Sequence, residues 1–269
     1  MIRRAAVLFS IAVAAAVPAG AQDQALDPLL FGPHPSASEQ ITDVEARTVQ
    51  LYRLPLSIPL RPMTAEQWGI RVTFPLSLSS LRVNGASDLG PFAKKLGIAA
   101  IVPGLELEIP LSAELRMRPF AEFGFGKAGG STEVLYGMGD RLMLQHPAGI
   151  ANLSYGVTGM YRNSYTSNRE YDGHGTFEAG IDAQFPLGFS VGPKAARAGG
   201  YFIARKFAGL ELARDNQEPL TLSHQYEVGA SFSTSPVLSV WKLKLPWIAA
   251  GYHFGHTLSG VRIYTKFPF

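Results

Sequence analysis

The sequence predicts an all-β protein, a transmembrane antiparallel up-and-down β-barrel of about 12 strands (range about 10–12), because three patterns of such barrels occur together. Apolar and polar residues alternate along most of the chain, which is the pattern of a strand with one apolar face. The alternating segments recur roughly every 20 residues, with turn-forming residues between them. After the N-terminal stretch, no segment is apolar for long enough to span a bilayer as a helix.

The composition excludes several other classes of protein. The 269-residue chain is 46% hydrophobic and 17% charged, which is too apolar for a disordered protein. It contains no cysteine, so disulfide frameworks, thiolate metal sites and cysteine nucleophiles are excluded. The formal net charge is only +3 and the basic residues are scattered, so we expect no nucleic-acid partner.

The N-terminal residues predict export. Residues 1–21 combine a short basic start, an apolar stretch and the small residues Ala19-Gly20-Ala21, which is typical of a signal peptide cleaved before Gln22. Residues 22–46 are polar and irregular, and we expect a flexible N-terminal extension there. The barrel itself is assigned to residues 47–269.

A hairpin centred on Ala113 is the clearest pair of predicted strands. In both strands, apolar residues occupy one face, and charged residues and glycines occupy the other. The matching register places Ile109 opposite Met117 and Glu108 opposite Arg118. Opposite charges across neighbouring strands stabilise the pairing, so the charges support a register chosen from the apolar face.

About eleven segments in all show the strand pattern, whereas bacterial single-chain barrels have even strand numbers. They span residues 48–61, 67–80, 97–112, 114–127, 132–145, 149–165, 173–188, 198–212, 221–235, 240–254 and 259–269. The missing strand could lie in the N-terminal extension, or the stretch 236–254 could divide. Residues 131–145 change face partway, and residues 197–212 fit either face.

The polar face distinguishes a membrane barrel from a soluble one. A soluble β-sandwich or filled barrel also alternates, but its outward face is normally rich in lysine, aspartate and glutamate. Here the polar face is rich in glycine, serine and threonine with scattered charges, as in the lumen of a membrane barrel whose apolar face meets lipid. Tyrosines and tryptophans near strand ends, Tyr201 and Trp247 among them, are expected at the headgroup level.

Three stretches carry a resemblance to a known family: Val102–Pro110, Leu115–Glu122 and Leu243–Gly255. They resemble the central and C-terminal hairpins of the solitary outer-membrane autotransporter-type β-barrel family of bacteria, over roughly residues 48–269. The resemblance implies a porin-like Gram-negative outer-membrane barrel without a secreted passenger. It implies no catalytic residues and no cofactor.

The last predicted strand carries a second resemblance. Val261, Ile263, Phe267 and Phe269 share one face of residues 259–269. A last strand that ends in phenylalanine resembles the signal by which the bacterial barrel-assembly machinery recognises its clients. The resemblance implies that this machinery is a partner of the chain.

Charged residues on the polar face are the candidate site. They are expected to line the lumen, and they comprise Arg71, Glu106, Glu108, Arg116, Arg118, Glu122, Arg162, Glu178, Asp182, Glu227, Arg262 and Lys266. One interpretation is a charged constriction that selects ions or small solutes. The other is a filled lumen in which the charges pair across strands, which the mixed signs and the narrow bore of about twelve strands favour.

The histidines predict no metal site, since no pair of them has metal-ligand spacing. His253, His256 and Ser259 could belong to a lipid-hydrolysing site at the barrel rim, but no spacing fixes such a site, and a girdle or loop position is expected for the histidines.

The sequence therefore predicts a bacterial outer-membrane barrel, structural or a narrow passive pore, in contact with membrane lipid and possible small solutes, and not an enzyme. A lipid-modifying enzyme and a translocator for a separate chain are the alternatives.

Overall fold

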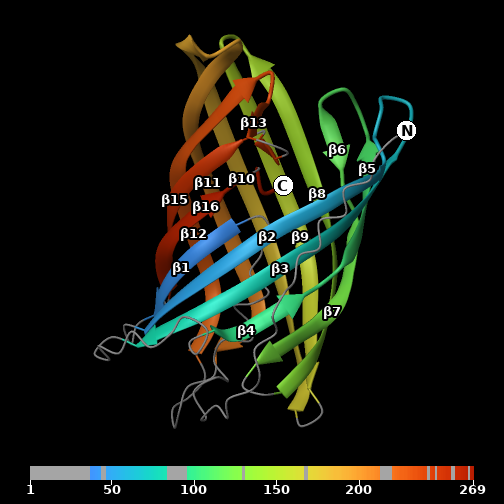
Figure 1. Cartoon of the computed structure of the whole chain (residues 1–269), viewed down its shortest axis with the longest axis vertical. Coiled ribbons are helices and arrows are strands. Elements are labelled where there is room, and N and C mark those ends of the chain that lie inside the picture. Colours follow the sequence, from blue (N-terminus) through green and yellow to red (C-terminus); the bar gives the residue numbers. More distant parts are fainter. Residues whose placement is uncertain are drawn as a thin grey trace, which may run out of the picture.

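The computed structural model describes residues 37–43, 47–83, 96–128, 131–166, 169–212, 220–240, 243–245, 247–255, 258–265 and 267–269. The regular structure of these residues is entirely β (Figure 1). No helix among them is long and apolar enough to cross a membrane.

Sixteen strands make up the described secondary structure. They are β1 (Ala37–Asp43), β2 (Arg47–Arg61), β3 (Gly69–Val83), β4 (Leu96–Ile101), β5 (Gly104–Pro110), β6 (Leu115–Met117), β7 (Phe120–Ala128), β8 (Ser131–Ala148), β9 (Ala151–Thr166), β10 (Arg169–Val191), β11 (Lys194–Leu212), β12 (Leu220–Ser235), β13 (Leu238–Val240), β14 (Leu243–Leu245), β15 (Ile248–Gly255) and β16 (Leu258–Tyr264).

The strands form one closed antiparallel barrel, with β13 and β14 set apart as a separate two-stranded sheet. Two positions of the barrel wall are each shared by two short strands, because β4 and β5 both pair with β3, and β6 and β7 both pair with β8. Fourteen of the described strands therefore occupy twelve positions in the wall (14 − 2). The predicted fold class and strand number agree with this architecture.

Strand β1 supplies the strand that the sequence pattern lacked. It pairs with β2 on one side and with β16 on the other, and so closes the barrel. The described part of the wall thus reaches back to Ala37, ten residues before the expected start at residue 47 (47 − 37), inside the stretch assigned to a flexible extension. Residues 1–36, which include the predicted signal peptide, lie outside the described residues.

The predicted hairpin centred on Ala113 has the expected register. Ile109 pairs with Met117, and the guanidinium of Arg118 lies 3.3 Å from a carboxylate oxygen of Glu108. Pro103 lies in the break between β4 and β5, and Pro119 lies in the break between β6 and β7. Because proline cannot donate a hydrogen bond to the ladder, it divides each wall position into two short strands.

The two faces of the wall differ as the alternation predicts. Large apolar side chains are exposed on the outside, among them Phe123, Phe125, Phe177, Phe202, Tyr226, Val228, Tyr252, Phe254, Val261 and Ile263. Charged and polar side chains at the alternate positions are buried inside, as Glu178 and Glu227 illustrate.

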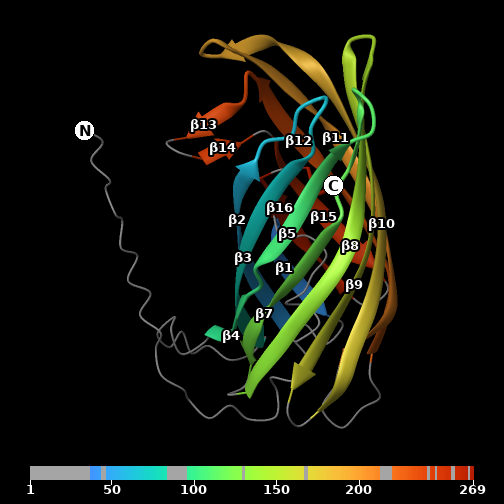
Figure 2. The same ribbon diagram turned by 90° about the vertical axis from the view of Figure 1, so that its right-hand side faces the viewer.

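The two ends of the barrel differ in their connections. At the end where Ala37 pairs with Tyr264, the hairpins β8–β9 and β10–β11 turn through only two residues each. Gly149 and Gly192 take positive φ values of 60° and 61° in these turns, which is the geometry of the tightest hairpins. The connections at the other end fall largely outside the described residues. Figure 2 shows β13 and β14 beside the tight-turn end.

The break between β4 and β5 gives a test of the packing. A Cβ atom at Gly124 would overlap the carbonyl oxygen of Ile101 and lie 2.5 Å from Cα of Val102. Gly124→Ala should lower the free energy of unfolding by about 1–3 kcal/mol, because the backbone must move to admit the methyl group. Urea unfolding followed by tryptophan fluorescence measures it.

Gly159→Ala is the matched control, because a Cβ atom at Gly159 meets no atom within 4 Å. It should leave the stability unchanged or slightly higher. Equal stability of the two variants would contradict the packing described for Gly124.

Candidate functional site

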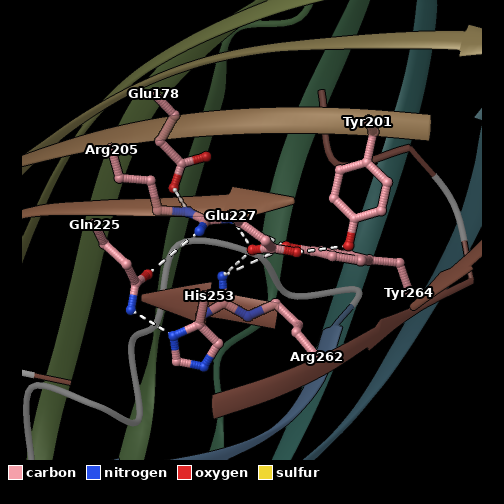
Figure 3. Close-up of polar contacts among 8 residues, drawn as sticks. All are labelled: Glu178, Tyr201, Arg205, Gln225, Glu227, His253, Arg262 and Tyr264. Carbon is pink, nitrogen blue, oxygen red and sulfur yellow. Dashed lines mark hydrogen bonds and ion pairs between the residues drawn. The ribbon is translucent and has the colours of Figure 1, made fainter. Parts of the chain in front are cut away.

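The polar side chains inside the barrel form the candidate site. They gather in two large groups on facing parts of the wall. One group, the Glu227 network, comprises Glu178, Tyr201, Arg205, Gln225, Glu227, His253, Arg262 and Tyr264 (Figure 3). The other, the Glu106 cluster, comprises Arg71, Glu106, Glu108, Arg118, Glu122, Arg141 and Arg162.

Glu227 of β12 is the centre of the first group. Its Oε2 lies 2.8 Å from the guanidinium of Arg205 and 2.9 Å from that of Arg262, and it accepts a hydrogen bond from the Tyr264 hydroxyl at 2.9 Å. Its Oε1 accepts a hydrogen bond from the Tyr201 hydroxyl at 2.7 Å. One carboxylate thus joins β11, β12 and β16 across the intervening strand β15.

Arg205 extends the network across the wall. Its Nε donates to Glu178 of β10 at 3.2 Å, and its other nitrogens donate to the Gln225 amide oxygen and the Tyr264 hydroxyl. Gln225 in turn lies 2.7 Å from Nδ1 of His253 on β15. The side chains of Arg205, Glu178 and Glu227 are completely buried.

The charges of the Glu227 network are balanced. Glu178 and Glu227 carry the negative charges, and Arg205 and Arg262 carry the positive ones. Removal of a charge from water costs several kcal/mol unless a partner and further hydrogen bonds replace the water. The hydroxyls of Tyr201 and Tyr264 supply such hydrogen bonds to the Glu227 carboxylate, so each charge of the network has a partner inside the barrel.

The Glu106 cluster repeats this arrangement on the facing part of the wall. Glu108 of β5 lies between Arg71 at 3.2 Å and Arg118 at 3.3 Å. Glu106 pairs with Arg141 of β8, whose guanidinium also lies 4.0 Å above the ring of Phe120. Beside them, Glu122 of β7 accepts a hydrogen bond from Arg162 of β9.

Asp182 of β10 is held separately, nearer the tight-turn end. Its carboxylate accepts hydrogen bonds from the Ser231 hydroxyl at 2.5 Å and from the indole nitrogen of Trp247 at 3.0 Å. These neutral donors replace the water that a buried carboxylate loses.

The structure places the predicted lumen charges as follows. Glu106, Glu108, Arg162, Glu178, Asp182, Glu227 and Arg262 are buried, whereas Arg71, Arg116, Arg118 and Glu122 are partly buried. Lys266 lies outside the described residues. Among the described ones other than Arg116, each has an ion pair or a side-chain hydrogen bond, within one of the two groups or, for Asp182, with Ser231 and Trp247.

Sequence reasoning missed two arginines that hold the groups together. Arg141 and Arg205 fall in the stretches whose alternation was ambiguous. In both stretches, apolar side chains also point inward, as Leu135 and Ile203 do, and this blurs the contrast between the faces. For Arg205, the available signal was the register of β10 and β11, which places it opposite Glu178.

Three expectations about aromatic residues and histidine are wrong. Tyr201 and Trp247 are only 4% and 6% exposed and lie inside the barrel, where hydrogen bonds to Glu227 and Asp182 hold them, and not at a headgroup girdle. His253 is fully buried in the Glu227 network, so it belongs to neither the rim nor a loop. His256 lies outside the described residues.

The expected single face of the last strand is also corrected. Val261 and Ile263 are exposed outside, at 51% and 53%, but β16 ends at Tyr264. Phe269 is 2% exposed and packs with Phe267 against the buried core inside the barrel. The described pairings of β16 with β1 and with β15 both end at Tyr264.

The described residues include no group of three or more histidine, aspartate or glutamate side chains that could hold a metal ion. The charged groups inside the barrel instead present carboxylates to guanidinium, hydroxyl or indole donors. These contacts cross-link strands of the wall through their side chains.

Comparisons with known proteins extend the description of the fold. No family model and no curated protein matches the chain. The β domain of the Bordetella autotransporter BrkA is similar in structure, with a TM-score of 0.57 and 9% sequence identity over 86% of this chain and 97% of that chain. This likeness shows a shared barrel fold.

Two further solved structures match less well. LpxR from Salmonella typhimurium has a TM-score of 0.41 and 12% identity, over 85% of this chain and 98% of that chain. The KdgM porin has a TM-score of 0.37 and 9% identity, over 86% and 98%.

The Glu227 network gives the second test. Glu227→Ala leaves Arg205 and Arg262 without the carboxylate that bridges them, and it should lower the free energy of unfolding by about 3–5 kcal/mol. The midpoint of urea unfolding measures the loss.

Glu114→Ala is the control, because Glu114 pairs with His146 while both side chains stay 43% and 52% exposed. Such an exposed pair contributes at most about 1 kcal/mol. Equal losses in the two variants would refute the central position of Glu227.

Proposed function

We propose that the chain is an integral outer-membrane β-barrel of a Gram-negative bacterium, structural or a narrow passive pore, and not an enzyme. The observation that supports this proposal best is the distribution of apolar and charged side chains, which is the reverse of that in a water-soluble protein. Large apolar residues are exposed on the outside, while ionised pairs are buried inside. In water this distribution would be unfavourable, because apolar residues would stay exposed while charges are buried. In a membrane the outer face meets lipid, so the same distribution is favourable.

The outer aromatic residues support the membrane position. The ring of Tyr226 lies between those of Phe202 and Phe254, with centroid distances of 6.3 and 6.0 Å, and all three rings are about 40% exposed. Exposed apolar patches of this kind mark a surface that meets lipid or protein. The patch runs across three neighbouring strands, β11, β12 and β15, as a lipid-facing band does.

The paired charges support a closed or narrow lumen. Buried guanidinium groups and carboxylates fill the space that an open pore would leave to water. Barrels of about eight strands are filled by side chains and those of 16–18 leave an aqueous channel, so twelve positions fall between. An autotransporter-type family with the assembly machinery as partner is part of the proposal, supported by the likeness to the BrkA β domain and by the outward Val261 and Ile263.

A charge on the outer face tests the membrane position. Val228 is 46% exposed and pairs with Phe202 and Tyr252, which are also exposed. Val228→Arg should lower the stability of the barrel in phospholipid vesicles by about 2–4 kcal/mol if it lies near the bilayer middle. Urea unfolding from the vesicles measures the change.

Ile150→Arg is the control, because Ile150 is 73% exposed in the tight turn between β8 and β9, outside the expected lipid band. A charge near the interface should cost at most about 1 kcal/mol. Fractionation of the wild-type chain should yield it in the outer membrane with heat-modifiable mobility on gels. Recovery as a soluble periplasmic protein, or a neutral effect of Val228→Arg, would refute the proposal.

A further inference from the structure

Residues 267–269 occupy the inside of the barrel. In both views, the C-terminal end lies among the strands and not beyond their tips (Figures 1 and 2). Phe269 is 2% exposed, and Phe267 packs beside it with ring centroids 5.2 Å apart. This segment is therefore part of the lumen contents.

The segment crosses the lumen from one part of the wall to the facing part. It leaves the wall at Tyr264 of β16, yet Phe269 reaches Gly156 of β9 and Gly180 of β10. In the strand order, β9 lies five positions from β16 in a wall of twelve, almost diametrically opposite. Five extended residues reach at most roughly 17 Å, which is the longest distance that can separate Tyr264 from Phe269.

Two glycines make room for the ring of Phe269. A Cβ atom at Gly156 would overlap the ring, and one at Gly180 would lie 2.6 Å from Cε2. Glycine allows close approach to the backbone because it has no side chain. The wall is thus shaped for an aromatic side chain at this point.

Contacts hold the segment from both sides. The guanidinium of Arg118, in the Glu106 cluster, donates a hydrogen bond to the main-chain oxygen of Phe269 at 3.3 Å. On the other side, the ring of Phe267 lies 5.4 Å from that of Trp247, which contacts Tyr201 and Tyr264 of the Glu227 network at 5.6 and 6.0 Å. The segment therefore bridges the two polar groups with a layer of aromatic rings.

We propose that residues 267–269 are a plug that closes the lumen to ions and small solutes, seated by Arg118, Gly156 and Gly180. The aromatic rings lie between the two paired charge groups, and hydrophobic constrictions stop conduction by excluding water. The inference rests on the proposed membrane barrel and adds the element that sets its conductance.

Phe269→Ala tests the plug in planar bilayers bathed in potassium chloride. The substitution empties the glycine-lined seat, and the mean single-channel conductance should rise severalfold above that of the wild-type chain. Phe254→Ala is the matched control, because Phe254 lies on the outer face of β15, 40% exposed. It should leave the conductance unchanged. An unchanged conductance in Phe269→Ala would overturn the proposal.

A cross-link tests the position of the segment directly. The natural chain has no cysteine, so the double variant Gly156→Cys, Phe269→Cys carries only the introduced pair. Mild oxidation of the folded barrel should form a disulfide in high yield and restore the low conductance, and reduction should raise it again. Failure to form the disulfide would overturn the proposal.

The two proposals fail differently. If the wild-type chain does not fractionate with the outer membrane, the proposed function is refuted. The yield of the Gly156–Phe269 cross-link in the purified folded protein then decides by itself whether the segment is seated inside the barrel.

Discussion

The structure depends on the pairing of charges that closure of the barrel removes from water. Once the wall closes, every inward charged side chain either finds a partner or costs several kcal/mol. The register of the strands determines which inward charges meet. At Glu227, for example, donors from β11 and β16 converge on one carboxylate. The same bonds that remove the cost also tie together strands that share no backbone hydrogen bonds. One network therefore both offsets the cost of burying charge and links strands of the wall.

The outer and inner faces of the wall are subject to different sequence constraints. The outer face needs only apolar residues at alternate positions, which many sequences supply, and the BrkA β domain shares the fold at 9% identity. The inner face needs specific partners, such as Arg141 for Glu106 and Trp247 for Asp182. The residues that distinguish one such barrel from another thus lie in the lumen, where one substitution affects several strands.

Much of the fold follows from the alternation, and the errors have physical reasons. The hairpin around Ala113 was predictable because apolar and charged faces agreed on one register. Strand β1, whose residues are ASEQITD, has little apolar alternation and is defined by its partners β2 and β16. Arg205 was missed because Ile203 and Tyr201 also point inward. The departure of Phe269 from the wall could not be predicted, because alternation does not reveal where neighbouring strands end.

Pairing of β1 with β16 has a consequence for how the barrel forms. Ala37 meets Tyr264 at a sequence separation of 227 residues (264 − 37), the greatest of any described strand pairing in the wall. Contacts of such separation are slow to form, because a long loop must be closed before they give any stability. Until then, β1 and β16 are open edges that can pair with another strand. Folding of this chain should therefore finish at that junction, and a catalyst of folding would act there by shielding the two edges until they meet.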